Sequence, residues 1–535
     1  MTSSLGSPIR TRHRRVASEP LRAVLGLLML GALTLAVAAC SAPRARTAAA
    51  APPPGAQLDR ADVLWLDRVG FGIDTPELTR FERLGRARFL AEQLRSSAAA
   101  LPAPIAAQIQ SLAISHLNLP ATLADLERER RAIRFMASGV ERQQARQELN
   151  RQGNELAYQA MRRELLRAVY SPAQLKEQMV WFWLNHFSVH QYKGDLRWLV
   201  ADYEERAIRP NALGHFRDLV LATLEHPAML EYLDNRHNAL GHVNENYARE
   251  LMELHTLGVG AGYTQEDVEV LARVLTGVGI NAGPAPRLRG ELRALYVRRG
   301  VFEFNPARHD FSPKILLGAR VQGRGLAEVE NAVTLIVREP ACAQFISREL
   351  ATYFVADDPP PALVAAMART FEETDGDIAA VLRTLFLSRE LDTALGGKLK
   401  DPMRYVISAV RLAYDDRPIS NARPLIGWLR ALGEAPFDRQ TPDGYPLTES
   451  SWSSPGQMSR RFEIARAIGR GNDHLFDSED QTIPRTAGFP QLSSRLYFAT
   501  VEPYLAPRTR ATLGQAESAP EWNTFLLASP ELNYE

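Results

Sequence analysis

The segment 174–185 reads Q-L-K-E-Q-M-V-W-F-W-L-N, and its run W-F-W-L from Trp181 to Leu184 is apolar on every side of a helical turn. The pair Ser171-Pro172, just before it, is typical of a helix start. A helix that is apolar all round is buried. The segment therefore predicts a helix inside a helical core.

Outward from this segment, the helical period continues over most of the chain. Apolar residues recur at spacings of three and four from Leu58 onward, with breaks at Gly and Pro and few alternating runs. The pattern predicts an all-α fold with one large, multi-lobed helical body, of which 58–400 is the main part and 401–535 a helical and loop-rich C-terminal lobe. The predicted helices are 143–167, 174–185, 227–234, 245–257, 265–275, 326–338, 341–354, 361–373, 378–388 and 402–413. Between 277 and 318 the period fades, and 295–304 is expected to form a short hairpin or an irregular loop.

The composition is that of a globular protein without a strong charge. The 535 residues include 63 Lys and Arg against 62 Asp and Glu, which gives a formal net charge of +1, and 45% are hydrophobic. These proportions exclude disorder as the main state. The near-zero charge argues against nucleic acid as the main partner.

Residues 1–39 have the layout of an export signal. Basic residues up to Arg22 precede an apolar run from Ala23 to Ala39, and V-A-A-C at 37–40 resembles the lipobox of bacterial lipoproteins. We therefore expect cleavage before Cys40, its lipidation with palmitate, membrane attachment through it, and an Ala/Pro-rich tether at 40–57. Two alternatives stay open, an uncleaved membrane anchor and a twin-arginine signal at Arg14-Arg15. The other cysteine, Cys342, is expected to be a packed thiol.

The densest polar cluster lies in the predicted helix 245–257. At about 100° per residue, Asn246, Glu250 and Glu253 share one polar face. Glu250 and Glu253 could ligate a metal, or form a pair in which crowding raises one pKa for acid–base work. On an undistorted helix His255 would lie opposite Glu253, so the two could not ligate one metal. In the alternative interpretation, Glu245 pairs with Arg249 and the other acids face water.

Two further clusters contain histidine. His186 and His190, in N-H-F-S-V-H at 185–190, share a face if the helix continues, and this is the spacing of metal ligands. Packed histidines bonded to backbone carbonyls are the alternative. The irregular segment 304–314 brings together His309, Asp310 and Lys314, which suits either a functional loop or a salt-bridged one. Elsewhere, His226 precedes the helix start at Pro227, and T-D-G-D at 374–377 is interpreted as a turn that caps the next helix.

Several of these segments together resemble one bacterial family. They are N-H-F at Asn185, H-P-A-M-L-x-Y-L-D-N at His226, N-E-N-x-A-R-E-L-M-E-L-H-T-L-G-V at Asn244, A-R-V-L-T-G at Ala272, R-H-D-x-x-x-K at Arg308, K-D-P at Lys400 and P-D-G-Y-P at Pro442. The family is catalogued as domain of unknown function 1800 (DUF-1800), and the likeness covers about residues 60–520. Two positions depart from it, because Val follows Gly277 where a Trp is expected and Tyr445 stands where Trp is commoner.

The resemblance implies an exported, mostly helical bacterial protein, but no known reaction. It also implies a partner, a second exported protein of unknown function encoded nearby. We expect a lipoprotein of the cell envelope, which in a two-membrane host would be anchored in the outer membrane and face the periplasm. It would act on an envelope or imported polymer, while a non-catalytic binding or assembly lipoprotein is the alternative.

The hypothetical site is one polar pocket that binds a divalent metal as its cofactor. The predicted metal ligands are His186, His190, Asn246, Glu250 and Glu253. The predicted catalytic residues are Glu250, Glu253, His309, Asp310 and Lys314. A catalytic pocket must open to solvent, whereas the structural network of the alternative should be closed and fully paired.

Overall fold

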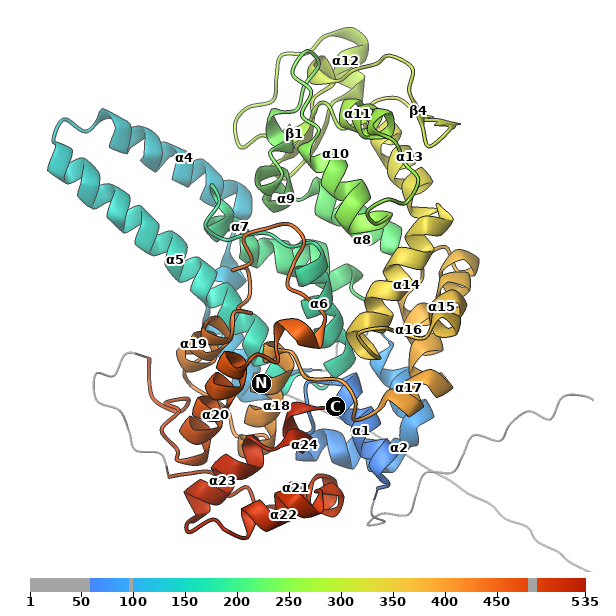
Figure 1. The fold of residues 1–535 in the computed structure, drawn as a ribbon. Coiled ribbons are helices and arrows are strands. Elements are labelled where there is room, and N and C mark those ends of the chain that lie inside the picture. The colour runs from blue at the N-terminus through green and yellow to red at the C-terminus, as the bar shows by residue number, and fades with distance from the viewer. Residues whose placement is uncertain (1–57, 96–99, 480–487) are drawn as a thin grey trace, which may run out of the picture. The chain divides into compact units, whose positions relative to one another are not determined.

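Helices make up most of the computed structural model, which describes residues 58–95, 100–479 and 488–535. These residues form 24 α-helices and five short β-strands (Figure 1). The prediction of an all-α fold is confirmed. The predicted signal peptide at 1–39, Cys40 and the tether at 40–57 lie outside the described residues. Within the described ranges, none of the helices combines the length and apolarity needed to cross a bilayer.

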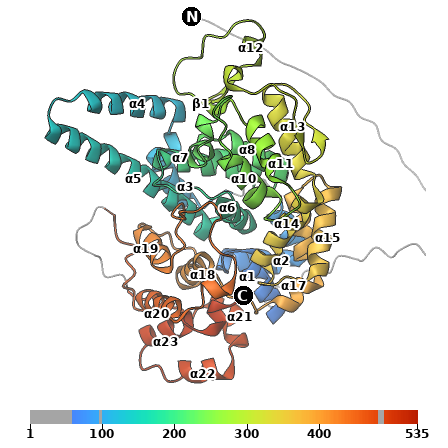
Figure 2. The ribbon, with the colours of Figure 1, turned by 45° about the horizontal axis from the view of Figure 1, so that its top comes forward.

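The first part of the chain builds one side of the body and a projecting arm. Its helices are α1 (Arg60–Val69), α2 (Thr75–Gln93), α3 (Ala103–Ser111), α4 (Leu119–Phe135) and α5 (Gly139–Tyr170). Helices α4 and α5 pack on each other and extend away from the remaining helices in both Figure 1 and Figure 2. From Gly153 onward, α5 becomes part of the buried core.

The central part surrounds α6 (Gln174–His186). Its helices are α7 (Leu196–Asp202), α8 (Phe216–Glu225), α9 (Pro227–Tyr232), α10 (Asn246–Glu250) and α11 (Gln265–Val274). Trp181, Phe182 and Trp183 are at most 3% exposed, which confirms the burial predicted for α6. Two π-helical turns interrupt this region, at Tyr203–Ile208 after α7 and at Leu251–Thr256 after α10.

The short strands lie where the helical period fades. Strand β3 (Phe302–Phe304) pairs antiparallel with β1 (Val278–Ile280) and with β2 (Val297–Arg299), so the predicted hairpin at 295–304 is present, with a third strand beside it. Helix α12 (Gly290–Leu295) precedes β2, and β4 (Ile315–Leu316) pairs with β5 (Ala319–Arg320).

The remaining helices complete the body. They are α13 (Leu326–Val337), α14 (Pro340–Phe354), α15 (Pro361–Glu373), α16 (Ile378–Phe386), α17 (Arg389–Ala394), α18 (Pro402–Tyr414), α19 (Arg423–Leu432), α20 (Pro455–Gly469), α21 (Arg495–Thr500), α22 (Pro507–Leu513), α23 (Ala519–Leu527) and α24 (Pro530–Asn533). Asp377 caps α16 by accepting from Ala380 N, as its turn sequence predicted. Cys342 on α14 is a buried free thiol.

One continuous apolar core runs from Leu58 to Leu532. The described residues from 58 to 535 group into a single compact unit by their contacts. This part of the chain therefore contains the whole described core.

Candidate functional site

A pocket of about 310 Å³ opens where four distant segments meet, and we call it the carboxylate pocket. The end of α6, the π-helical turn after α10, helix α14 and the loop 443–447 supply its walls. Three sequence segments that resemble family motifs, at Asn185, Asn244 and Pro442, contribute to it. Its lining is Phe182, Asn185, His186, Glu253, Leu254, Val259, Phe345, Glu349, Asp443, Tyr445 and Leu447.

Asn185 attaches the loop 443–447 to the end of α6. Its amide nitrogen donates to Tyr445 O at 2.9 Å, and its side-chain oxygen accepts from Tyr445 N at 2.5 Å. Gly444, the residue before Tyr445, has φ +71°, and a Cβ at this position would stand 2.4 Å from Asn185 O. Only glycine allows the loop 443–447 to approach the end of α6 this closely.

His186 lines the pocket as a neutral imidazole. Its Nε2 lies 3.0 Å from His255 O, and since a carbonyl can only accept, Nε2 carries the proton and Nδ1 is left as an acceptor. Burial lowers the pKa of His186 to about 4. The ring of His255, 6.1 Å away between centroids, is also buried and has a pKa well below its usual value. Neither histidine therefore brings positive charge to the pocket at neutral pH.

The π-helical turn changes the arrangement predicted for helix 245–257. That helix is regular only over α10, and the wider turn Leu251–Thr256 brings His255 into the core beside His186. Glu253 lines the pocket and is held loosely by Arg249 at 3.4 Å, while Arg249 also pairs with Glu245 at 3.1 Å. Burial, and next the Glu253 carboxylate, raise the pKa of Glu250. The prediction from an undistorted helix missed this geometry because a π turn is a local exception to the 3.6-residue period.

Two carboxyl groups that we did not predict complete the pocket. Glu349 on α14 has no hydrogen-bond or ion-pair partner among the described residues, and burial raises its pKa to about 7. Asp443 has the opposite shift, because hydrogen bonds from Arg439 and Thr441 outweigh its burial and hold its pKa below the usual range.

A sequence signal for Glu349 was available. Ile346, Leu350 and Tyr353 are buried and, with Glu349, occupy positions i, i+3, i+4 and i+7 of one helix face. A lone carboxyl group on a core-facing stripe is therefore a candidate for function. For Asp443 the only signal was the resemblance of its segment to the family motif.

His190 and Asn246 lie apart from the pocket lining. Helix α6 ends at His186, so His190 is not on the same helical face, and its ring contacts Tyr192. The Asn246 amide donates to Leu233 O at 3.1 Å. Within 58–95, 100–479 and 488–535, no group of three or more His, Cys, Asp or Glu side chains is arranged to hold a metal ion.

His309, Asp310 and Lys314 form a separate cluster with Glu328, which we call the His309 cluster. Lys314 Nζ pairs with Glu328 Oε1 at 2.6 Å, and His309 Nε2 lies 3.4 Å from Glu328 Oε2. His309 Nδ1 donates to Thr276 O at 2.8 Å, and Asp310 pairs with Arg273 at 2.8 Å. His309 and Lys314 are at most 3% exposed. These groups are paired with one another, so the cluster joins the segment 272–277 to the segment 308–314.

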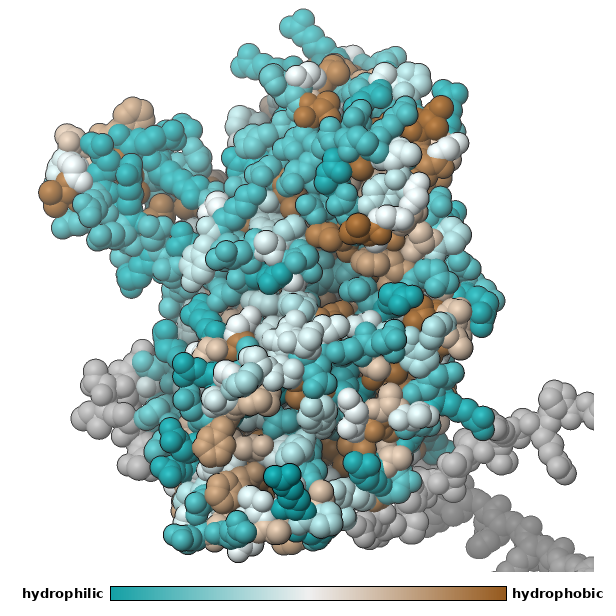
Figure 3. All heavy atoms as spheres, viewed as in Figure 1, coloured by the Kyte–Doolittle hydropathy of each residue, from teal (hydrophilic) through white to brown (hydrophobic). Residues whose placement is uncertain are grey.

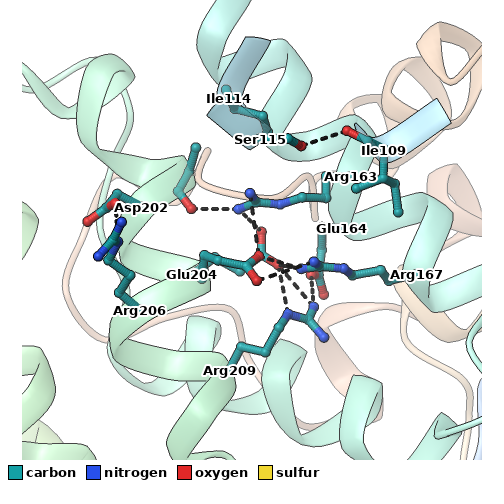
Figure 4. Close-up of polar contacts among 12 residues, drawn as sticks. Ile109, Ile114, Ser115, Arg163, Glu164, Arg167, Asp202, Glu204, Arg206 and Arg209 are labelled. Atoms are coloured by element: carbon teal, nitrogen blue, oxygen red, sulfur yellow. Dashed lines mark hydrogen bonds and ion pairs between the residues drawn. The ribbon is translucent and has the colours of Figure 1, made fainter. Parts of the chain in front are cut away.

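A third group of charged side chains, which we call the Arg209 cluster, lies mostly buried between α5, α6 and the π-helical turn after α7 (Figure 4). Arg209 pairs with Glu177 at 2.7 Å, Glu164 at 3.0 Å and Glu204 at 2.9 Å. Arg163 and Arg167 also contact Glu204, and Arg167 pairs with Glu205. Burial raises the pKa of Glu164 well above its usual value. With Glu164 protonated, the guanidinium groups of this cluster are equal in number to its remaining carboxylates, so its charges are paired. A pocket of about 220 Å³ reaches the edge of the cluster at Arg163, Arg167 and Glu205.

Comparison with known proteins gives one match. The family model described as "Protein of unknown function (DUF1800)" matches residues 64–534. No curated protein and no solved structure matches the chain. The family match covers nearly all of the described body, including the carboxylate pocket and both buried clusters. The chain therefore belongs to the DUF1800 family of proteins of unknown function.

Proposed function

We propose that this protein is an exported lipoprotein that hydrolyses a neutral or cationic polymer of the cell envelope, or one imported into it, by acid–base catalysis in the carboxylate pocket. The carboxylate pocket has the size of a small ligand site, and it combines aromatic walls with a few polar groups. Among the described residues no lysine or arginine lines it, while Glu253, Glu349 and Asp443 do. This charge disfavours an anionic substrate.

The observation that carries the proposal is the pair Glu349 and Asp443. Their surroundings push the two pKa values apart, since burial raises that of Glu349 to about 7 and hydrogen bonds hold that of Asp443 low despite its burial. One protonated and one ionised carboxyl group in the same pocket is the pattern of acid and base in hydrolases such as those that cleave glycosidic bonds. A polysaccharide is therefore the polymer class that we favour.

In the proposed reaction each proton has a defined place. Glu349 donates its proton to the leaving oxygen as the bond breaks, while ionised Asp443 takes a proton from the attacking water. After the reaction Asp443 releases its proton to solvent and Glu349 takes one up from solvent, so both carboxyl groups return to their starting states. His186 Nδ1 accepts a hydrogen bond from a substrate hydroxyl, and Tyr445, Phe345 and Phe182 provide the walls.

Substitutions at the two carboxyl groups test the reaction. Wild type, Glu349→Gln, Asp443→Asn and the control Glu372→Gln, which removes an exposed carboxylate of α15, are incubated with a panel of polysaccharides, and new reducing ends are counted. We expect each pocket variant to lose about 100-fold or more in rate and the control to keep it. The wild-type rate should fall above about pH 7 as Glu349 loses its proton. Equal rates in wild type and both pocket variants would overturn the proposal.

The export part of the proposal is supported by the sequence V-A-A-C at 37–40. We propose that Cys40 carries the lipid, that the protein is anchored to a membrane of the envelope, and that its partner is the second exported protein encoded nearby. Metabolic labelling with palmitate should mark the wild type and spare Cys40→Ser. Labelling of both would contradict the assignment.

The alternative function, a binding or assembly lipoprotein, draws its support from the two other clusters. The His309 cluster and the Arg209 cluster are buried and consist of paired groups, as a network that fixes helix positions should be. If no polymer is cleaved but one is bound at the carboxylate pocket, this alternative gains weight.

A further inference from the structure

Helices α4 and α5 form an antiparallel arm, and its outer end is the connection from Phe135 to Val140. The two helices pack on each other through buried residues of α4 such as Leu126 and Ile133. The outer halves of both helices are otherwise exposed. At about 1.5 Å per residue, the 17 residues of α4 give the arm a length of roughly 25 Å.

The outer end of the arm is apolar. Phe135 is 84% exposed, the largest value for any large hydrophobic side chain in the described ranges, and Val140 is 67% exposed. Met136 lies between them and is partly buried. Figure 3 shows hydrophobic atoms at this end of an otherwise hydrophilic arm. The folded body gives these side chains no apolar surroundings, although an exposed phenylalanine is costly in water.

Arginines of both helices surround this apolar end. Residues 125–148 contain six arginines and five acidic residues, and two of the arginines, Arg128 and Arg130, pair with Asp125 and Asp195. Arg131 and Arg146 are exposed and have no ion pair or hydrogen bond within the described part of the chain. Arg134 is 65% exposed, with Glu127 only at 3.4 Å. Arg142 braces the connection by donating to Met136 O at 2.9 Å.

We propose that the outer end of the arm binds the surface of an anionic lipid bilayer. Phe135, Met136 and Val140 enter the boundary between headgroups and acyl chains, while Arg131, Arg134 and Arg146 bind headgroup phosphates. Apolar side chains flanked by basic ones are the pattern of segments that lie at a membrane interface. The end is convex and narrow, so it suits a deformable bilayer better than a flat protein surface. This inference is independent of the reaction proposed for the carboxylate pocket.

Vesicle binding tests the proposal with residues 49–535, which contain the whole described core and lack the apolar run at 23–39. The wild type should bind vesicles of phosphatidylcholine with phosphatidylglycerol and bind pure phosphatidylcholine much less. Phe135→Ser/Val140→Ser should reduce binding about tenfold. Arg131→Gln/Arg146→Gln should reduce it about fivefold per arginine on anionic vesicles only. The matched control Leu387→Ser, at a side chain 59% exposed elsewhere, should bind as wild type does.

A second readout reports on the arm itself. Residues 49–535 contain Cys342 as their one cysteine, and it is buried, so an environment-sensitive dye on Ser138→Cys would label the arm alone. Its emission should shift to the blue with anionic vesicles. Wild type that does not bind these vesicles, or an unshifted dye on bound protein, would overturn the proposal. If Phe135→Ser/Val140→Ser instead dissolves an oligomer seen by sedimentation, the end is a contact between copies of the chain and the bilayer assignment is wrong.

Discussion

The two π-helical turns of the body carry acidic side chains into opposite surroundings. At Tyr203–Ile208, Glu204 enters the Arg209 cluster, where it contacts three arginines and is fully buried. At Leu251–Thr256, Glu253 faces a pocket that also contains Glu349, which has no partner among the described residues. The same local distortion thus serves a cluster of paired charges in one place and an acidic pocket in the other. Pairing, rather than the presence of charged residues, separates a structural network from a candidate site.

The largest effect is expected from breaking the Arg209 cluster. Arg209→Met keeps the side-chain volume but leaves buried carboxylates without their central partner, so it should lower the free energy of unfolding by about 3–5 kcal/mol. Denaturant unfolding followed by circular dichroism measures this. The control is Arg206→Met, because Arg206 is 70% exposed and, within the part of the chain that the structure describes, pairs with Asp202 alone; it should cost less than about 1 kcal/mol. A similar, small cost for both variants would show that the Arg209 cluster is not structural.

Breaking the His309 cluster should also lower the free energy of unfolding, but by less. Lys314→Met removes the buried partner of Glu328, while the contact of Glu328 with His309 Nε2 at 3.4 Å stays, so we expect a loss of about 2–3 kcal/mol. Lys193→Met is the matched control, since Lys193 and Asp234 form a half-exposed pair. If Lys314→Met unfolds at the wild-type denaturant concentration while its helix content is intact, the cluster is not what holds segments 272–277 and 308–314 together.

At the carboxylate pocket, a substitution should raise the free energy of unfolding instead of lowering it, and the size of this effect should depend on pH. The pKa of Glu349 is raised from 4.5 to about 7 in the folded protein, so its contribution to stability is complete below about pH 4.5 and is lost as the pH rises to about 7. The Glu349→Gln variant has no such loss, so its free energy of unfolding should rise relative to that of wild type by about 2 kcal/mol as the pH increases from about 4.5 to about 7. Unfolding curves at several pH values check this. A constant difference between the two proteins would mean that Glu349 is not desolvated.

The smallest effect is expected at the rim of the pocket. Arg249 pairs with Glu245 and Glu253 while 37% exposed, so Arg249→Gln should change stability by less than about 1 kcal/mol, and less at high salt. It should also raise the pKa of Glu250 further, because Arg249 lowers that pKa. Titration of the Glu250 carboxyl group by NMR would detect this shift. An unchanged titration would show that Arg249 does not influence the pocket.

The sequence by itself determined the elements of this fold. Helices such as Pro361–Glu373 begin and end where the apolar period and the prolines predicted, and Asp377 caps its helix as its turn sequence indicated. Local signals suffice here, because periodicity, caps and turns depend on residues within a few positions of one another. The burial of Trp181 to Leu184 also followed from composition alone.

Only the tertiary structure decided which polar groups meet. His186, Glu349 and Asp443 are far apart in the chain, and their meeting depends on how α6, α14 and the loop 443–447 pack. The same packing put His309 and Lys314 with Glu328 and away from the pocket. The π turn at Leu251–Thr256 then set which side of its helix faces His186. Spacing along one helix predicts its faces, but the partner of each face is determined by the packing energy of the whole core.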